Sequence, residues 1–496
     1  MNLLVQAMTE KDSYTENGAL TNSTSHNFNL DLFFLAGACR NESVENIENI
    51  LVKSYAYDRI KTLKIIFWAG DIRGGAGERR FFKLALNWLY NNHKEDLYTY
   101  LDKVPEFSRW DVLFQFEDDR IFNYIIEQFK AGNSLLCKWL PRKAKRTETK
   151  KSEKTVKHGR TTETTVTKYK TTRVVKDGYA LKLRKKLGWN EAQYRKHLVK
   201  YTNVVETQMC NKAWSDINYE HVPSVAMNKY NKAWYRNDKE RFEAYIESVK
   251  SGEKKINAGA IFPHDIIGQV VYSDMSGIPS LNKAQITQWN NLPDYMSDFS
   301  ILPICDVSAS MTWENNAMAM KISLALGLYI SERNKGVFKD AFITFSSNPR
   351  LQYLQGNIND RIRQLIRQDW NGNTDIEAVF DLILDRAVSG RIPESEMPRS
   401  VLIISDMEFD EGTTGTDTTH EVIEKKYRNA GYRCPNIIYW NVNGRVGNVP
   451  VTTNDYGAAL ISGASPSILK AVLTDDVNPE KIMNNAIESE RYSFIK

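Results

Sequence analysis

Oxygen-bearing side chains follow an apolar run in the C-terminal half of the chain. Asp306, Ser308 and Ser310 stand at alternating positions there, directly after the apolar run 301–305. Alternation on an extended backbone directs all three side chains to the same side. Carboxylate and hydroxyl oxygens are the ligands that hard cations such as Mg²⁺ prefer. The spacing therefore predicts part of a metal site, although Asp and Ser also gather in ordinary turns.

Two further segments supply oxygen atoms of the same kind. Thr374 stands in a loop directly before the helical pattern 376–383, and Asp406 follows the expected strand 401–405, whose residues 401–404 are apolar. Asp306 and Asp406 thus each end a short apolar run, which is typical of a buried parallel strand. Open α/β sheets bind ligands at the carboxyl edge of their strands. We therefore expect the three segments to meet at one edge of a sheet.

Strands and helices alternate from about residue 301 to the C-terminus, which is typical of a doubly wound parallel sheet. The sequence predicts an α/β domain over 296–496. The expected strands are 301–305, 341–345, 401–405, 436–440 and 458–461, and the expected helices are 315–333, 358–368, 375–388, 418–430, 466–474 and 479–491.

The order of these residues resembles the von Willebrand factor A domain, which has a Rossmann-like fold and a metal-ion-dependent adhesion site. The resemblance implies Ser308, Ser310 and Thr374 as direct ligands of Mg²⁺ or Mn²⁺, with Asp306 and Asp406 acting directly or through water. It also implies a protein partner that supplies an Asp or Glu to an open position on the metal. Glu408 and Asp410, in the acidic loop 406–411 beside the predicted metal, either regulate the site or are solvated loop acids, and we favour the second interpretation. A Mg²⁺-dependent hydrolase is the weaker interpretation, because the sequence shows no accompanying base, nucleophile or second metal cluster, and we predict no enzyme activity.

The segment 29–295 has helical patterning, and residues 1–28 are polar and expected to be flexible. Successive helices joined by short turns indicate an α-solenoid. A glycine-rich loop at 71–80 opens one of these helices. It lacks the Gly-Lys-Ser/Thr ending of a P-loop and follows no buried strand, so we interpret it as an interhelical turn.

A basic insertion at 142–177 interrupts the helices. Between Arg142 and Lys176 thirteen Lys or Arg and three Glu give a net charge of +10, whereas the whole chain carries only +5. Alternation over 164–175 predicts an exposed β-ribbon. The insertion is either a solvated surface segment or an arm that neutralises nucleic-acid phosphates. The residues predicted to contact RNA on the second interpretation are Arg142, Lys143, Lys145, Arg146, Lys150 and Lys151.

Four paired motifs in the helical segment look like the TROVE module of the Ro ribonucleoprotein family. They are Leu187-Gly188-Trp189 with Tyr194-Arg195, Val222-Pro223-Ser224 with Lys229-Tyr230, Arg236-Asn237-Asp238 with Arg241-Phe242, and Ile256-Asn257-Ala258 with Phe262-Pro263-His264. The chain is more similar still to an uncharacterised Ro-like family that joins such helices to an A domain. The similarity covers about residue 30 to the C-terminus apart from the basic insertion.

The Ro resemblance implies a HEAT-like helical ring that holds single-stranded RNA ends and binds small structured RNAs. On this chain it implies RNA contacts at Lys229, Arg236, Lys239, Arg241 and His264. The alternatives are a surface ion pair of Arg236 with Asp238 and a helix-capping role for His264. Contacts with RNA would combine phosphate neutralisation with stacking of unpaired bases.

The composition is that of a globular protein, with 42% hydrophobic and 26% charged residues. No apolar run is long enough for a membrane span, and the polar N-terminus lacks a signal peptide's features. Five scattered cysteines favour reduced thiols and therefore a cytoplasmic protein. We also expect a monomer. The predicted function is non-catalytic RNA binding combined with metal-dependent recruitment of a protein. The alternative is a metal-dependent assembly or structural factor, viral or phage components included, that binds no RNA.

Overall fold

The computed structural model describes residues 13–142, 144–158, 161–175, 178–271, 280–296, 301–312, 317–345, 349–367, 374–411, 417–474 and 476–496, with the backbone alone for 144–158 and 161–175. The chain divides into two compact units. One consists of the chain up to Ser108 together with Trp214–Lys496, and the other is Arg109–Ala213.

The first unit contains a six-stranded sheet in the order β10-β9-β8-β5-β6-β7. Adjacent strands are parallel, except that β7 is antiparallel to β6. The helices and this sheet confirm the predicted combination of an α-helical part with an α/β part. The edge strand β7 was not predicted, because it is short and exposes Leu351 and Tyr353 rather than following an apolar run. The strands are β5 (Ile301–Cys305), β6 (Ala341–Thr344), β7 (Leu351–Tyr353), β8 (Ser400–Ser405), β9 (Asn436–Asn441) and β10 (Ala458–Ser462).

The strand order places a topological switch point between β5 and β8. After β5 the chain adds β6 and β7 on one side, and it then returns to add β8, β9 and β10 on the other. The register pairs Cys305 with Ile404. Asp306 and Asp406 therefore leave neighbouring strands at the same edge, which is where open α/β sheets bind ligands.

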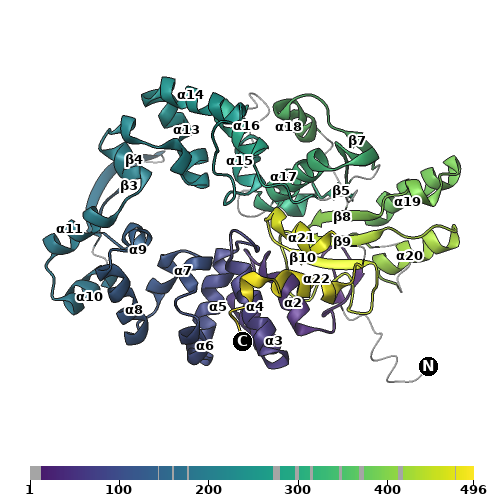
Figure 1. Cartoon of the computed structure of the whole chain (residues 1–496), viewed down its shortest axis with the longest axis horizontal. Coiled ribbons are helices and arrows are strands. Elements are labelled where there is room, and N and C mark those ends of the chain that lie inside the picture. Colours follow the sequence, from purple (N-terminus) through teal and green to yellow (C-terminus); the bar gives the residue numbers. More distant parts are fainter. Residues whose placement is uncertain are drawn as a thin grey trace. The chain divides into compact units, whose positions relative to one another are not determined.

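Helix α17 (Met318–Arg333) packs against β5 and β8, and lies above the strands in Figure 1. Its Gly327 faces Cys305, and a β-carbon on Gly327 would overlap the Cys305 sulfur. Glycine thus lets the helix approach the strand that carries Asp306. The other helices of this part are α18 (Ile358–Ile366), α19 (Ile376–Gly390), α20 (Thr419–Asn429), α21 (Leu469–Val472) and α22 (Pro479–Ile487).

N-terminal helices pack against the sheet within the same unit. Helix α2 and helix α22 both contact β10. Asp71 is buried, forms an ion pair with Arg491, and accepts backbone hydrogen bonds from Arg73 and Gly74. The glycine-rich loop is therefore an interhelical turn as predicted, whereas the boundary at residue 296 stays a prediction. These helices are α2 (Phe28–Ala36), α3 (Val44–Tyr57), α4 (Arg59–Gly70), α5 (Arg79–Asn92), α6 (Lys94–Thr99) and α7 (Val104–Phe107), and later helices of the unit are α13 (Ser224–Asn237), α14 (Lys239–Lys250), α15 (Pro263–Val271) and α16 (Lys283–Asn290).

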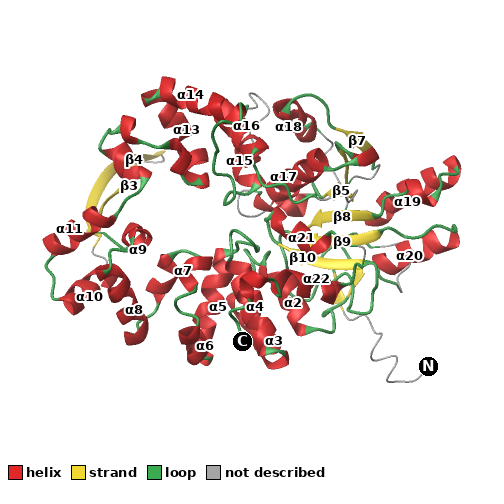
Figure 2. Cartoon of the chain, in the orientation of Figure 1, coloured by secondary structure: helices red, strands yellow, loops and turns green. Residues whose placement is uncertain are grey.

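The second unit combines short helices with a long antiparallel hairpin, drawn as paired strands in Figure 2. The stretch 164–175, predicted as a ribbon, lies in one strand of this hairpin, 161–175. The other strand, 144–158, has the same length. Helices pack around Phe129, whose ring contacts Trp189, Tyr194 and His197. The elements are α8 (Asp119–Lys130), α9 (Ser134–Trp139), β3 (Ala144–His158), β4 (Thr161–Val175), α10 (Gly178–Leu187), α11 (Glu191–Tyr201) and α12 (Val205–Cys210).

Two global features concern membranes and thiols. Within the described ranges, no helix combines the length and the apolar character that crossing a bilayer requires. The cysteines are free, and Cys39, Cys137 and Cys305 are buried.

Candidate metal centre and nucleic-acid contacts

Asp306 and Asp406 lie next to each other at the carboxyl ends of β5 and β8, and they are 0% and 1% exposed. Ser405 Oγ donates to Asp306 Oδ2 at 2.5 Å, and the Ser308 amide donates to Asp306 Oδ1 at 2.8 Å. By contrast, Asp406 Oδ2 accepts no hydrogen bond from the described part of the chain. A buried carboxylate oxygen without a partner is unfavourable. A bound cation would satisfy this oxygen.

The two carboxyl groups also perturb each other. Burial and the charge of Asp306 raise the pKa of Asp406 to about 8, and the nearby Ser310 hydroxyl opposes this rise. Burial likewise raises the pKa of Asp306 above its usual range. Like charges at close range disfavour double ionisation, and a divalent cation reverses that effect.

The three predicted hydroxyl ligands are all described. Ser308 Oγ lies 3.0 Å from Ser310 Oγ, so these two hydroxyls meet beside Asp306. Thr374 is 1% exposed, and its backbone carbonyl accepts a hydrogen bond from the Asp410 amide at 3.2 Å. The loop that follows Asp406 therefore links Thr374 to the same sheet edge.

The donor set fits a hard cation. No group of three or more His, Cys, Asp or Glu side chains capable of holding a metal occurs in the described ranges. The candidate site contains only two carboxylates, so a bound metal would need the hydroxyls of Ser308, Ser310 and Thr374 as further ligands. An all-oxygen set of this kind suits Mg²⁺ or Mn²⁺ better than a thiolate- or imidazole-preferring metal.

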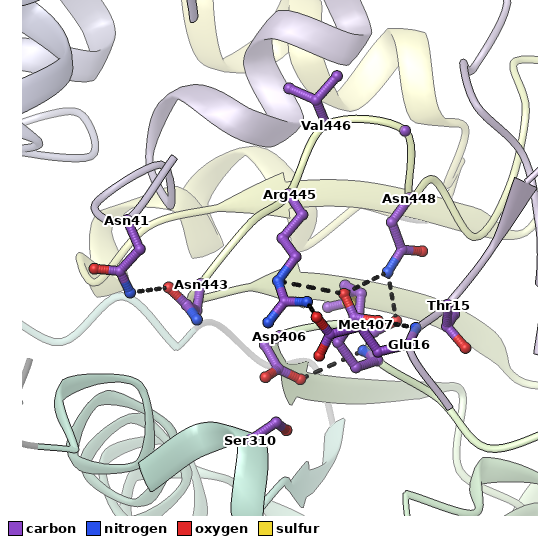
Figure 3. Close-up of polar contacts among 12 residues, drawn as sticks. Thr15, Glu16, Asn41, Ser310, Asp406, Met407, Asn443, Arg445, Val446 and Asn448 are labelled. Carbon is purple, nitrogen blue, oxygen red and sulfur yellow. Dashed lines mark hydrogen bonds and ion pairs between the residues drawn. The ribbon is translucent and has the colours of Figure 1, made fainter. Parts of the chain in front are cut away.

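The loop after Asp406 contains a residue whose environment the sequence did not predict. Glu408 is 2% exposed rather than solvated, and burial raises its pKa to about 7. Its Oε1 accepts a hydrogen bond from Asn448 Nδ2 at 3.2 Å and lies 3.8 Å from Arg445 Nε. Asn448 and Arg445 are labelled in Figure 3. Asn448 and Arg445 follow β9, and no local pattern in the sequence links them to Glu408.

The N-terminus also reaches this edge. The sequence assigned 1–28 to a flexible tail, of which 1–12 lie outside the described residues. The strands β1 (Ser13–Tyr14) and β2 (Leu20–Thr21) instead form a small antiparallel hairpin, whose residues hydrogen-bond to the loop after Asp406. The hydrogen bonds satisfy polar groups that a free tail would leave to water.

Residues from the loop after α2 and from the loop after β9 line a small cavity beside the candidate ligand Ser310. The cavity has a volume of about 10 Å³, and Arg40, Asn41 and Asn443 contribute to its wall. Asn41 Nδ2 donates to Asn443 Oδ1 at 2.9 Å (Figure 3). The surroundings of the candidate metal site thus include residues from outside the α/β part.

The predicted RNA contacts in the basic insertion are only partly described. Arg142 is exposed and donates to Thr202 Oγ1 at 2.8 Å. Lys143 lies outside the described residues. The backbone alone is described at the other predicted positions, which are Lys145, Arg146, Lys150 and Lys151 in β3.

The predicted RNA contacts in the first unit have different environments. Lys229 and Arg236 are exposed on α13. Arg241 donates to the backbone carbonyls of Trp214 and Ile217, at 3.2 Å and 2.6 Å, and so stabilises a neighbouring turn. Among the described residues, Asp238 pairs with Arg241, with Arg241 Nε 3.6 Å from Asp238 Oδ2, and not with Arg236. Arg241 is therefore engaged by the protein itself.

His264 is a poor candidate for contact with phosphate. Its side chain is 12% exposed, and its Nδ1 has no hydrogen-bond partner among the described residues. Burial lowers the pKa of His264 to about 4, with a further lowering from the charges of Arg40 and Lys321, which Asp265 opposes. The imidazole is therefore neutral near pH 7.

The buried His264 predicts acid destabilisation. Unfolding would let this histidine take up a proton at its usual pKa of about 6.5, whereas the folded protein does not bind that proton until about pH 4. The contribution of His264 to the free energy of unfolding should thus be fully present above pH 6.5. It should fall as the pH drops towards 4, with a loss of up to ~3 kcal/mol. Urea titrations between pH 7 and pH 4 should show a shallower loss for His264→Gln. His221→Gln, at an exposed position, serves as control, and an unchanged slope in His264→Gln would contradict the prediction.

Comparisons with known proteins identify two family models along this chain. The domain of unknown function DUF2828 matches residues 15–159 and 117–302, and the domain of unknown function DUF7788 matches residues 300–493. "Uncharacterized protein L728" of Acanthamoeba polyphaga mimivirus is 25% identical over 96% of this chain and 87% of its own length. The crystal structure of the Deinococcus radiodurans Ro (RSR) protein matches 94% of this chain and all of that chain, at 12% identity and a TM-score of 0.39.

Proposed function

The chain belongs to the family of the domain of unknown function DUF2828, and from its own residues we propose a non-catalytic, Ro-like RNA-binding protein with a Mg²⁺-dependent adhesion site. The observation that carries the metal-dependent part is the buried pair Asp306 and Asp406, with an oxygen of Asp406 left without a partner. Such a pair is unfavourable in an empty protein interior and favourable around a cation.

The proposed site holds Mg²⁺ or Mn²⁺ through the hydroxyls of Ser308, Ser310 and Thr374. Asp306 and Asp406 supply negative charge, directly or through water. When bound, the metal offers an open position to an anionic oxygen of a ligand. We propose that a carboxylate of a partner protein takes this position, so that the site binds a partner rather than turning over a substrate.

The metal-dependent part is tested by binding of Mn²⁺ to the full-length protein. Isothermal titration calorimetry in chelator-treated buffer should show one site that Mg²⁺ competes for. Release of protons on binding is expected, because the cation favours the ionised form of both carboxyl groups. Absence of saturable Mn²⁺ binding by the wild-type protein would refute this part of the proposal.

RNA binding is supported by the register of the β3–β4 hairpin. The pairing sets Arg146 opposite Arg173 and Lys151 opposite Lys168. Like charges directly opposite each other destabilise a strand pair, and a two-stranded hairpin is only marginally stable in water. A polyanion that neutralises these charges would stabilise the hairpin. This argument favours nucleic acid over an uncharged partner.

RNA binding has its own test. Protein purified at moderate salt should carry RNA that nuclease removes, and the stripped protein should bind RNAs with single-stranded ends in a gel shift. If no RNA copurifies and none binds, the metal-dependent assembly factor without RNA becomes the better hypothesis. The metal-binding result is independent of this outcome.

A further inference from the structure

The N-terminal hairpin (residues 13–21) holds the loop that follows Asp406. Thr15 Oγ1 donates to the carbonyl oxygen of Phe409 at 2.6 Å. The backbone amide of Glu16 donates to Glu408 Oε2 at 2.6 Å, and Asn17 Nδ2 donates to the Glu408 carbonyl at 2.7 Å. Glu408 is thus held at its side chain and at its backbone by adjacent residues of one turn, part of which is visible in Figure 3.

Arg445 closes this arrangement from the loop after β9. Its guanidinium forms an ion pair with Glu16 (Figure 3) and lies 3.8 Å from Glu408 Oε1. Beyond the hairpin, Asn22 and Val449 exchange backbone hydrogen bonds of 3.1 Å and 2.9 Å. The N-terminal hairpin and the residue that follows it therefore contact two segments, the loop after Asp406 and the loop after β9.

The loop held by the hairpin touches two of the proposed metal ligands. The Glu408 amide donates to Asp406 Oδ1 at 3.3 Å. The Asp410 amide donates to the Thr374 carbonyl at 3.2 Å, while Asp410 also forms a backbone bridge with Gly18 of the hairpin. A change in the hairpin would consequently reach both Asp406 and Thr374 through one short loop.

The backbone of this loop needs such support. Met407 has φ of +68°, a left-handed conformation that is unfavourable for a residue with a side chain. Strained residues of this kind persist only where their surroundings hold them. Asn448 Nδ2 donates to the Met407 carbonyl at 2.8 Å, and Thr21 of the hairpin donates to Asn448 Oδ1 at 3.2 Å.

We propose that the N-terminal hairpin is a positioning element of the metal site: by holding Glu408 and Asp410, it fixes Asp406 and Thr374 in the arrangement that binds the cation. This inference rests on the proposed function. It names the N-terminal hairpin as the segment that determines the affinity of the site for the cation. Segments about 390 residues apart in sequence thereby act on one binding site.

The test uses the full-length protein with Thr15→Val and Asn17→Ala combined, which removes two of the side-chain hydrogen bonds to the loop. We expect amide hydrogen exchange over 406–411 to accelerate at least 10-fold and the affinity for Mn²⁺ to fall at least 10-fold, with the far-ultraviolet circular dichroism unchanged. The matched control is Ser13→Ala. It removes a hairpin hydrogen bond to the Gly447 carbonyl, and both quantities should stay within 2-fold of the wild type.

The outcomes separate this inference from the proposed function. Wild-type protein that binds no Mn²⁺ refutes the proposed function. Wild-type binding with unchanged exchange and affinity in the double variant overturns the role of the hairpin and leaves the metal site standing. If the double variant does not fold, Arg445→Gln supplies the same test, because it removes the ion pair with Glu16 and the cation beside Glu408. Unchanged exchange and affinity in that variant overturn the inference.

Discussion

Asp406→Asn is expected to raise the melting temperature in EDTA and to abolish the stabilisation that Mg²⁺ gives the wild type. Asn has nearly the same shape as Asp but never ionises, so the substitution removes the free-energy cost of burying an ionisable carboxyl group beside the charge of Asp306. Relief of such a buried charge is expected to contribute ~1–3 kcal/mol, or a few degrees in melting temperature. The same change weakens the attraction for the cation. Mg²⁺ at 100 times its dissociation constant stabilises the wild type by about 2.7 kcal/mol, and this increment should disappear.

The opposite signs of these two effects distinguish a metal site from a structural hydrogen-bonding site. If Asp406 only capped a turn, its replacement would lower stability in EDTA and leave the response to Mg²⁺ unchanged. Differential scanning calorimetry with EDTA and with Mg²⁺ measures both quantities. Asp385→Asn is the matched control, since Asp385 is an exposed carboxylate on α19 of the same α/β part, and neither quantity should change.

The central strands could be predicted from the sequence because burial on both faces leaves continuous apolar runs. Strand β5 has the predicted bounds 301–305, and its residues are all buried. The same physical rule brought Asp306 and Asp406 to one sheet edge, because parallel neighbours end together. The edge strand β7 could not be predicted in this way, because a strand with exposed side chains has no continuous apolar run and resembles a loop in sequence.

The supporting residues of the site could not be predicted for a different reason. Glu408 looks like a loop acid, and its burial depends on Asn448, Arg445 and the N-terminal hairpin, all distant in sequence. Polar contacts of this kind have no periodicity, so a single sequence carries no trace of them. The residue type of a basic side chain likewise does not show whether that side chain contacts RNA or the protein itself. Arg241 and His264 resemble phosphate contacts by residue type, but the structure engages the first with backbone carbonyls and keeps the second neutral by burial.

Replacement of 144–175 by a short Gly-Ser linker is expected to weaken RNA binding at least 10-fold at ~0.1 M salt. The register pairs Ala144 with Val175, so the ends of the hairpin lie side by side and a short linker can join them without disturbing the flanking helices. Each lost phosphate contact to a single strand should reduce the slope of log K against log salt by about 0.7, and loss of several contacts should flatten it clearly. Fluorescence anisotropy with a labelled single-stranded RNA, measured at a series of salt concentrations, gives both affinity and slope.

Charge substitutions separate the loss of cations from the loss of the hairpin itself. Gln at Lys150, Lys151, Lys168 and Lys170 removes four charges from the two strands, among them the register pair Lys151 and Lys168, and should reproduce part of the change in slope. Arg at the same four positions is the matched control, because it keeps the charge and should bind RNA as the wild type does. An unchanged affinity and slope in the linker variant would show the hairpin to be a solvated insertion. The RNA contacts would then have to come from exposed cations elsewhere, such as Lys229 and Arg236 on α13.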